Sequence, residues 1–245
     1  MTNSKTPLRI DIISDVVCPW CAVGYGQLAE ALKQTDTEHE IHWHPFELNP
    51  DTPSEGRNWR EHIAKKYGSS REESDASRAR ITEAGAEVGF EFNFTEETRT
   101  YNTFDMHQLL HWADHQGHMH EWKQALFMAH FTHAKNLSKR DILADIAAQI
   151  GLDRSEALAV LEDQRFAEIV RQAQQHWRQQ GIQSVPSFIF NQKHLVSGAQ
   201  GVENFKSILQ HLAELPEQKA FLIISKLIWQ NQLLKSRYKK GQLKI

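Results

Sequence analysis

With 245 residues, of which 40% are hydrophobic and 24% charged, the chain has an ordinary globular composition, which excludes a disordered or fibrous protein. A net charge of -3 provides no basic face for a phosphate backbone, so we expect no nucleic-acid partner. No stretch reaches the roughly 18 apolar residues of a membrane span, and residues 1–9 lack the apolar run of a signal peptide, so we expect a cytoplasmic protein.

The first predicted element is a strand that leads into two cysteines. Leu8, Ile10 and Ile12 alternate with charged residues, which is the period of a strand with one buried face. Pro19 is expected to end this strand, and proline is well tolerated in the first turn of a helix. Because residues 22–33 carry apolar side chains at helical spacing, we expect a helix that begins at the cysteines.

The only cysteines of the chain form the motif Cys18-Pro19-Trp20-Cys21. A disulfide between them closes almost no loop and contributes little stability, which leaves redox chemistry or metal binding as its purpose. At a helix N-terminus, unpaired N–H groups and the helix dipole favour a thiolate at Cys18, whereas Cys21 lies one turn inside. We therefore expect Cys18 to be the nucleophile, with a depressed pKa, and Cys21 to be the resolving thiol. Half of a zinc site and two inert core cysteines are the alternatives.

The middle of the chain is predicted to be helical. A second strand is indicated before it by Ile41 and Trp43, which alternate with histidines, and prolines then mark a loop. From about residue 58 to 180 the pattern is almost wholly helical, with a capping-box match at Ser138 and Asp141. The phenylalanines of residues 90–94 interrupt it as a short extended piece.

β structure is predicted again after the helical middle. Residues 187–190 and 194–197 are expected to form a hairpin, followed by a helix at about residues 202–212. Because two β-containing ends flank a helical middle, we expect an α/β protein in which a sheet domain hosts a helical insertion. The predicted boundaries are residues 1–56 and 171–215 for the sheet domain, 57–170 for the insertion and 216–245 for a C-terminal helical extension.

These features together resemble the DsbA-like thioredoxin family, and most closely its FrnE-like branch. The resemblance covers about residues 8–212 and is carried by Cys18-Pro19-Trp20-Cys21, by Phe46-Glu47-Leu48-Asn49-Pro50, by Tyr101-Asn102-Thr103 with His107 and Trp112, and by Val185-Pro186 with Ser197-Gly198-Ala199-Gln200. It implies a thioredoxin fold, with a four-stranded mixed sheet and a large α-helical insertion that caps the active site. It also implies a thiol-disulfide oxidoreductase that acts as a dithiol oxidase, reductase or isomerase.

Pro186 stands where an apolar strand begins. In thioredoxin-like proteins this place holds a cis proline beside the active-site sulfur. A cis bond would turn the backbone of Val185 so that its N–H and C=O groups pair with an extended substrate. An ordinary trans proline at a strand start is the alternative. In combination with the cysteine motif, the cis form is the one we expect.

The resemblance also implies what the site binds. Substrate contacts are expected from Pro19, Trp20, Val185 and Pro186, and the expected partners are protein or small-molecule thiols and disulfides. No metal and no resident cofactor are expected. Glutathione is the candidate redox co-substrate, and a homodimer is one oligomeric state left open.

Two other functions are left open. Kappa-class glutathione transferases and hydroxychromene-carboxylate isomerases share the fold and generally have serine at the place of Cys18, so a glutathione-dependent isomerase or transferase is the first alternative. A non-catalytic metal-binding or partner-docking module is the second, because His107, His111 and His115 fall on one predicted helix face. The histidines that follow nearby are His118, His120, His130 and His133. The chain has 14 histidines, so such spacings also arise readily by chance.

The last predicted element is the C-terminal extension, in which apolar residues form an incomplete helical stripe beside basic ones. The apolar residues are Ile224, Leu227, Ile228 and Leu234. Such a helix can touch a membrane surface or a partner. A stripe of this kind more often packs on its own domain or on a second copy, and this is the outcome we expect.

Overall fold

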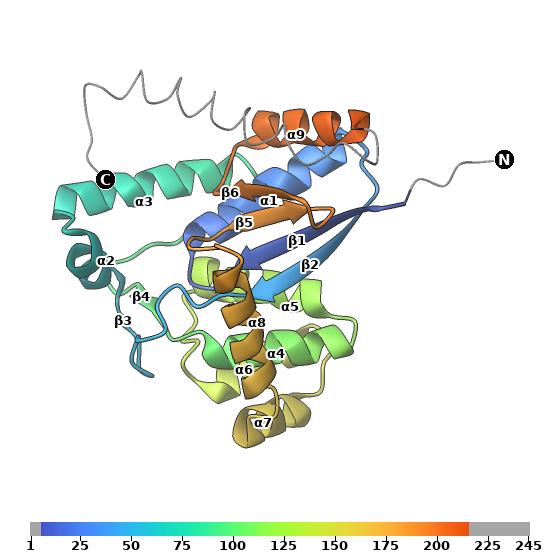
Figure 1. Ribbon diagram of the computed structural model, residues 1–245. Coiled ribbons are helices and arrows are strands. Elements are labelled where there is room, and N and C mark those ends of the chain that lie inside the picture. Colours follow the sequence, from blue (N-terminus) through green and yellow to red (C-terminus); the bar gives the residue numbers. More distant parts are fainter. Residues whose placement is uncertain (1–5, 216–245) are drawn as a thin grey trace.

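The computed structural model describes residues 6–215, and the predicted extension at residues 216–245 lies outside them. Figure 1 shows one four-stranded sheet with helices packed on both of its faces and a group of helices beyond one edge. The elements in chain order are β1 (Leu8–Ser14), α1 (Pro19–Gln34), β2 (His39–Pro45), β3 (Arg57–Asn58), α2 (Trp59–Tyr67), α3 (Arg71–Ala86), β4 (Arg99–Thr100), α4 (Phe104–His115), α5 (Met119–Phe127), the π-helix η1 (Met128–Thr132), α6 (Arg140–Gln149), α7 (Arg154–Asp163), α8 (Ala167–Gln179), β5 (Ser187–Phe190), β6 (His194–Ser197) and α9 (Val202–Glu214).

The main sheet is mixed and has the strand order β2-β1-β5-β6. β1 runs parallel to β2 and antiparallel to β5, and β5 and β6 form the predicted hairpin. In this register Ile12 lies between Trp43 on one side and Phe188 on the other, so large apolar side chains line up across the sheet. The expected α/β class with a four-stranded mixed sheet is confirmed.

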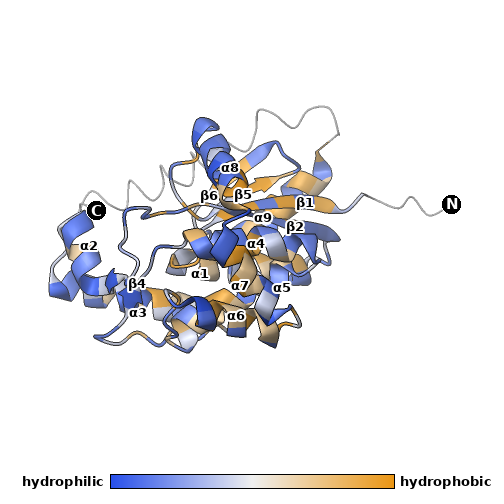
Figure 2. Cartoon of the chain, turned by 90° about the horizontal axis from the view of Figure 1, so that it is seen from below, coloured by the Kyte–Doolittle hydropathy of each residue, from blue (hydrophilic) through white to orange (hydrophobic). Residues whose placement is uncertain are grey.

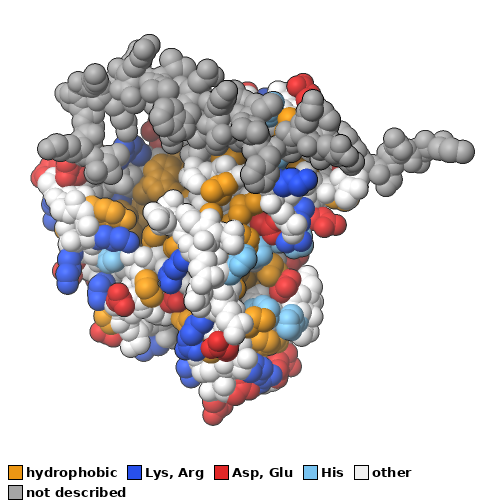
Figure 3. Space-filling view, in the orientation of Figure 1, with side chains coloured by type: hydrophobic (Ala, Val, Ile, Leu, Met, Phe, Trp, Pro, Cys, Tyr) orange, Lys and Arg blue, Asp and Glu red, His pale blue; other side chains and the backbone are white. Residues whose placement is uncertain are grey.

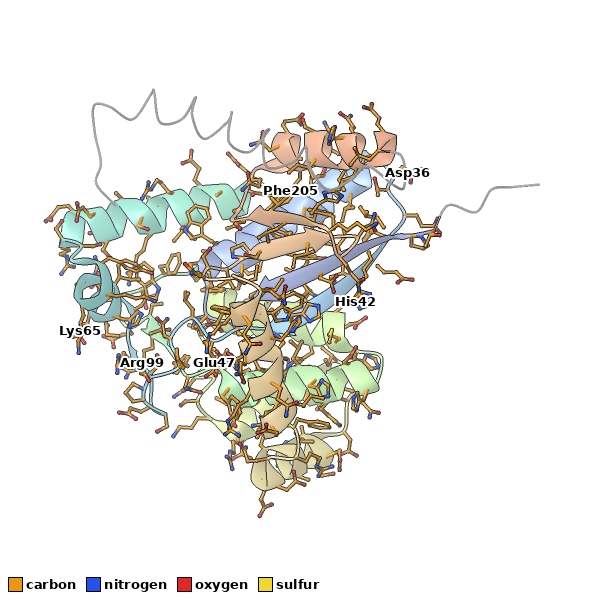
Figure 4. All side chains as sticks on the ribbon, in the orientation of Figure 1. Asp36, His42, Glu47, Lys65, Arg99 and Phe205 are labelled. Atoms are coloured by element: carbon orange, nitrogen blue, oxygen red, sulfur yellow. The ribbon has the colours of Figure 1, made fainter. Side chains whose placement is uncertain are left out.

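The alternation of side chains along β1 divides the core between the two faces of the sheet. Ile10 and Ile12 belong to the large cluster that contains Leu28 of α1 and Phe205 of α9. Ile13 points to the other face and packs with Phe46 and Ile182 in a smaller cluster. Phe205, labelled in Figure 4, meets Phe188 of β5 edge to face with 5.0 Å between ring centroids. Because side chains alternate along β1, both faces of the sheet carry apolar residues, and helices cover both faces.

The helical insertion lies between β2 and β5, as predicted. α4 packs against α5, α7 and α8, and α6 packs against α7. Figure 2 shows hydrophobic residues concentrated in the strands and on facing sides of these helices, whereas α2 and α3 are mostly hydrophilic. α8 contacts both α4 and β2, so the predicted boundary between residues 170 and 171 falls inside a helix that links the insertion to the sheet.

One local prediction differs from the structure. The capping box expected at Ser138 and Asp141 is wrong, because α6 begins at Arg140 and the hydroxyl of Ser138 instead donates to Asn136 Oδ1 at 2.6 Å. A capping box is present at the start of α3, where the side chains of Ser70 and Glu73 each accept from the other's backbone N–H. A serine followed three residues later by an acidic residue therefore caps a helix at Ser70, whereas at Ser138 the serine hydroxyl bonds within a turn.

The phenylalanine segment of residues 90–94 interrupts the helices, as predicted, and is itself neither helix nor strand. Phe90, Phe92 and Phe94 pack on one another and on Phe131 of η1, with 12° between the planes of Phe92 and Phe94. Alternate positions along an extended backbone point the same way, so these rings form one apolar cluster. The segment is held by aromatic packing in place of a strand partner.

The surface of the described chain carries charges of both signs. Figure 3 shows Lys and Arg side chains interspersed with Asp and Glu on the face that it presents. In the part of the chain that the structure describes, no helix combines the length and the apolar character that crossing a bilayer requires.

Candidate active site

The two cysteines lie where β1 passes into α1. β1 ends at Ser14, and Cys18 is the N-cap residue of α1 with an extended backbone at φ -94° and ψ 110°. Pro19 occupies the first turn of the helix, so the strand already ends five residues before the proline expected to stop it. Both thiols are free. Cys18 is the more accessible of the two, because it is 5% exposed and Cys21 is 0% exposed.

The segment that contains Pro186 lies against the cysteine motif. The Val185–Pro186 peptide bond is cis, as predicted, and the Cys18 thiol donates to the carbonyl oxygen of Val185 at 3.7 Å. Pro186 also packs on α1 at Gly24, where an added Cβ would lie 3.0 Å from the proline Cγ. The structure thus brings Cys18, Val185 and Pro186 together across 167 residues of sequence.

The other predicted substrate contacts differ in accessibility. Trp20 is 36% exposed and is the most exposed residue of the motif, whereas Pro19 is buried at the start of α1. Val185 is half-buried. An accessible indole and an accessible backbone segment therefore border Cys18, and Pro19 shapes the helix start.

A buried carboxylate that the motif analysis missed directly precedes the cysteines. Asp15 is 1% exposed; its Oδ2 accepts the backbone N–H of Leu48 at 2.7 Å, and its Oδ1 lies 3.5 Å from His107 Nε2. Burial alone would raise the pKa of Asp15, but the neighbouring His107 and the hydrogen bond from the backbone of Leu48 outweigh it and lower that pKa. An aspartate in the apolar run of residues 12–17 was the sequence signal for this residue.

Lys123 of α5 is a second buried charge beneath the motif. It is 0% exposed, and its Nζ donates to the carbonyl oxygen of Ser14 at 3.4 Å. The Nζ also lies 5.5 Å and 5.2 Å from the ring centroids of Trp43 and Phe127. Burial lowers the pKa of Lys123 to about 8, against the opposing effect of nearby negative charge. A lysine between apolar residues on the inward face of residues 119–127 was the signal that could have found it.

The two thiols have pKa values that differ in the direction opposite to the sequence expectation. The pKa of Cys18 is raised well above its ordinary value by its hydrogen bond to Cys21, by burial and by the negative charge of Asp15. Burial also acts to raise the pKa of Cys21, but the hydrogen bond from Cys18 and the positive charge of Lys123 lower it overall. The expected depression of the Cys18 pKa by the helix N-terminus is therefore outweighed by the interaction with Cys21, by burial and by the charge of Asp15.

The histidines of the insertion are separated by the fold. His107 faces Asp15, while His111 and His115 pack on each other at 4.6 Å between centroids and on Phe166. His120 accepts at Nδ1 from the indole of Trp43 at 3.2 Å, so it belongs to an aromatic cluster. Among residues 6–215, no group of three His, Cys, Asp or Glu side chains is arranged to hold a metal ion.

The segment after β2 ties the site to α8. Gln174 donates from Nε2 to Glu47 Oε2 at 2.9 Å and accepts the backbone N–H of Glu47 at 2.8 Å. Figure 4 shows Glu47 beside α8, and Leu48 next to it makes the bond to Asp15 described above. The segment thereby holds the carboxylate of Asp15 in place through a buried network.

Comparison with known proteins shows the family of the chain. A family model described as DSBA-like thioredoxin domain matches residues 9–210. The Bacillus subtilis protein YwbO is 30% identical over 203 residues, which are 82% of this chain and 96% of the relative. The crystal structure of a probable DsbA oxidoreductase from Streptomyces coelicolor has a TM-score of 0.80 at 30% identity and covers 86% of this chain and 93% of its own.

Two more distant structures share the fold. A 2-hydroxychromene-2-carboxylate isomerase has a TM-score of 0.66 at 13% identity over 84% of this chain and 96% of its own. The cytosolic disulfide reductase DsbM from Pseudomonas aeruginosa has a TM-score of 0.58 at 15% identity over 85% of this chain and 100% of its own, and it is also known in a form with GSH.

Proposed function

The chain belongs to the DSBA-like thioredoxin domain family, and from this membership we propose that it catalyses thiol-disulfide exchange through Cys18 and Cys21. Cys18 is the nucleophile and Cys21 the resolving thiol. The observation that carries this assignment is the contact of the Cys18 thiol with Val185 at 3.7 Å, beside the accessible segment that precedes Pro186. Cys21 is fully buried, so a protein disulfide reaches Cys18 first.

The assignment rests on the position of Cys18 beside Val185 and on the burial of Cys21, because the order of the two pKa values by itself favours a thiolate at Cys21. In the reduced pair the thiolate is favoured at Cys21, and Cys18 keeps its proton, which it donates to the carbonyl oxygen of Val185. As Cys18 attacks a substrate disulfide, its proton passes to Cys21, the substrate S–S bond breaks, and one substrate sulfur leaves as a thiolate. Cys21 must then lose that proton, attack the Cys18 sulfur and expel the second substrate thiolate.

Substrate contacts follow from the same geometry. We assign the backbone of Val185 to pairing with an extended substrate chain, and the exposed face of Trp20 to apolar contact beside Cys18. Pro186 shapes this segment, and Pro19 shapes the helix start. Protein and small-molecule thiols and disulfides are the proposed partners.

Glutathione is part of the proposal as the redox co-substrate, in a cytoplasmic setting. The structure of DsbM, a cytosolic disulfide reductase of the same fold, has been determined with GSH, which supports this choice. Cys18 is 5% exposed beside the more accessible Trp20, so we expect a small thiol to approach it from that side.

The proposal is tested by separating the two cysteines. Cys18→Ser is expected to abolish exchange with a disulfide substrate, whereas Cys21→Ser is expected to accumulate a mixed disulfide at Cys18, because attack still occurs but resolution does not. Mass spectrometry after non-reducing quench identifies the modified cysteine. If Cys21 were modified first in the wild-type protein, the two roles would be reversed.

The same variants distinguish the glutathione-dependent isomerase. Such an enzyme needs a bound glutathione and no second thiol, so isomerisation of a hydroxychromene carboxylate that survives in Cys21→Ser would favour that alternative. Loss of all turnover in Cys21→Ser, together with a trapped mixed disulfide, supports dithiol chemistry.

A further inference from the structure

Arg178 lies at the end of α8, against the segment that follows β2. Its side chain is exposed, and its Nη2 donates at 3.2 Å to the carbonyl oxygen of Glu47, which Figure 4 labels beside α8. The guanidinium carbon also lies 5.2 Å from the ring centroid of Phe46. A ring and a carbonyl oxygen thus hold a long side chain in one place. Arginine has five N–H donors, so several remain for a carboxylate that approaches in the plane of the group.

A short series of contacts connects Arg178 to the reacting sulfur. Phe46 belongs to the smaller core cluster, and Val185 packs against that cluster. The carbonyl oxygen of Val185 in turn accepts the Cys18 thiol at 3.7 Å. Arg178 is near along the chain as well, because residues 179–184 join it to Val185 and all but one of them are exposed. The guanidinium group therefore borders the surface on which a substrate chain paired with Val185 lies.

The charge of Arg178 is not neutralised within the described chain. Among residues 6–215 no carboxylate forms an ion pair with it, and the acceptor of its guanidinium group is a backbone carbonyl oxygen. The carboxylate of Glu47 is close in sequence to that acceptor, but Glu47 is 8% exposed and accepts from Gln174 Nε2 at 2.9 Å. Asp15 is 1% exposed and accepts the backbone N–H of Leu48. Both acidic groups are buried and engaged, so the exposed charge on this border is positive.

On the premise of the proposed function, we propose that Arg178 selects protein disulfides in which an acidic side chain lies a few residues from the reacting cysteine. Pairing with the backbone of Val185 is open to any extended sequence, so it provides no choice between substrates. An extended chain advances about 3.3 Å per residue, and an acidic residue a few positions from the cysteine therefore reaches the guanidinium group. Arginine side chains recognise acidic segments in this way.

The other cations of this region are placed differently. Lys123 is 0% exposed, so its ammonium group cannot touch a substrate side chain. Lys66 of α2 donates to Asn49 Oδ1 at 2.6 Å and is held by a side chain of the segment itself. Both add positive potential near the site. Arg178 is the cation that stacks on the cluster against which Val185 packs.

Two blocked peptides that carry one cysteine as a mixed disulfide with 2-thiopyridine test the proposal. The acidic peptide has glutamate at the third and fifth positions on both sides of the cysteine, and the neutral peptide has glutamine there. The Cys18 thiolate attacks the peptide sulfur and forms a Cys18–peptide disulfide, while the thiopyridine leaves with the electron pair, takes a proton and is read by absorbance.

We expect wild type to react about 5-fold faster with the acidic peptide, which is the scale of an exposed ion pair. The ratio should fall toward one in about 1 M salt, because screening is then nearly complete. The net charge of -3 does not attract acidic peptides at long range, so such a preference reports a local cation.

Arg178→Gln should remove the preference and leave the rate with the neutral peptide unchanged. Arg178→Glu should make the acidic peptide the slower of the two. Arg171→Gln is the matched control, because Arg171 is also exposed and stacks on Phe104 at 4.8 Å, but it lies two turns earlier on α8, about 10 Å along the helix axis. This control should keep the wild-type ratio.

A wild-type ratio near one, or a preference that survives in Arg178→Gln, overturns the inference. Equal slowing of both peptides in Arg178→Gln also overturns it, since Arg178 would then only shape the segment at Glu47. Should that variant fail to fold, Arg178→Lys and the salt series decide: a preference that 1 M salt leaves unchanged, or that is lost in Arg178→Lys, contradicts selection by charge. Absence of any release from the neutral peptide by wild type would instead contradict the proposed function itself.

Discussion

The proton affinities of the two thiols depend on each other, on burial, and on buried charges outside the motif. Asp15 raises the pKa of Cys18, and Lys123 lowers that of Cys21. In a protein interior such charges act far more strongly than at the surface, because water does not screen them. Side chains from the preceding turn and from α5 therefore add to the interaction between the two thiols in setting the two pKa values.

His130 gives a residue-scale prediction about pH. Burial lowers its pKa from 6.5 to about 4, so the folded state binds fewer protons than the unfolded state between these values. The stability associated with the neutral ring is complete above about pH 6.5 and is lost as the pH falls toward about 4. One pKa unit corresponds to about 1.36 kcal/mol, so the full loss is on the order of 3 kcal/mol.

His130→Phe is expected to remove this loss while keeping the packing on Tyr101 and Phe131. The free energy of unfolding in urea, measured at several pH values across that window, should fall less steeply in the variant than in wild type. His133→Phe changes an exposed histidine of the next turn and should leave the wild-type slope. Parallel slopes for wild type and His130→Phe would show that His130 does not titrate in this way.

At the scale of elements, close backbone approach decides how α3 joins the core. Gly85 lies in the last turn of α3, and an added Cβ would be 2.7 Å from the carbonyl oxygen of Phe90 and 2.6 Å from two ring carbons of Phe92. A contact this short forces a shift, and a backbone carbonyl cannot move as a flexible side chain can. The glycine thus allows the phenylalanine segment to pack against the helix.

Gly85→Ala is expected to destabilise the protein, although alanine favours a helix by about 1 kcal/mol over glycine. Overpacking costs of roughly 1–3 kcal/mol exceed that gain, and we expect a net loss in the free energy of unfolding. Ala86→Gly, at an exposed neighbouring position, isolates the helix propensity and should cost about 1 kcal/mol. Equal or greater stability of Gly85→Ala would mean that the segment relaxes without cost.

The whole molecule shares one large hydrophobic cluster. It contains Ile10 and Ile12 of the sheet, Leu28 of α1, and residues of the insertion such as Leu109 and Leu143. Hydrogen bonds also cross between the parts, including those of Lys123 to Ser14 and of Trp43 to His120. A continuous core of this kind links the stability of the insertion to that of the sheet.

We therefore expect the sheet and the insertion to unfold together. Native-state hydrogen exchange should give similar free energies of opening for protected amides of β1 and of α4, close to the global value. Coincident urea transitions by circular dichroism and tryptophan fluorescence are expected as well. Amides of α4 and α6 that exchange through a separate, less costly opening would show that the insertion unfolds on its own.

Local patterns were sufficient for the elements that carry the motif. The period of two placed β1 and the β5–β6 hairpin, and the glycine, proline and apolar spacings indicated a helical middle, because these signals depend on neighbours in sequence. The pair Cys18 and Cys21, together with Pro186, indicated the redox site. The resemblance that these residues carry implied the family, which the comparisons confirm.

Part of the electrostatic setting of the thiols was decided only by the tertiary structure. Lys123 reaches the carbonyl of Ser14 across 109 residues of sequence, and His107 reaches Asp15 from a different helix. The spacing of residues along the sequence does not predict either contact. The helix N-terminus by itself predicted the wrong direction for the pKa of Cys18. A pKa responds to every charge within a few ångströms, whichever part of the chain supplies it, and the packing of α4 and α5 against the sheet determines which charges those are.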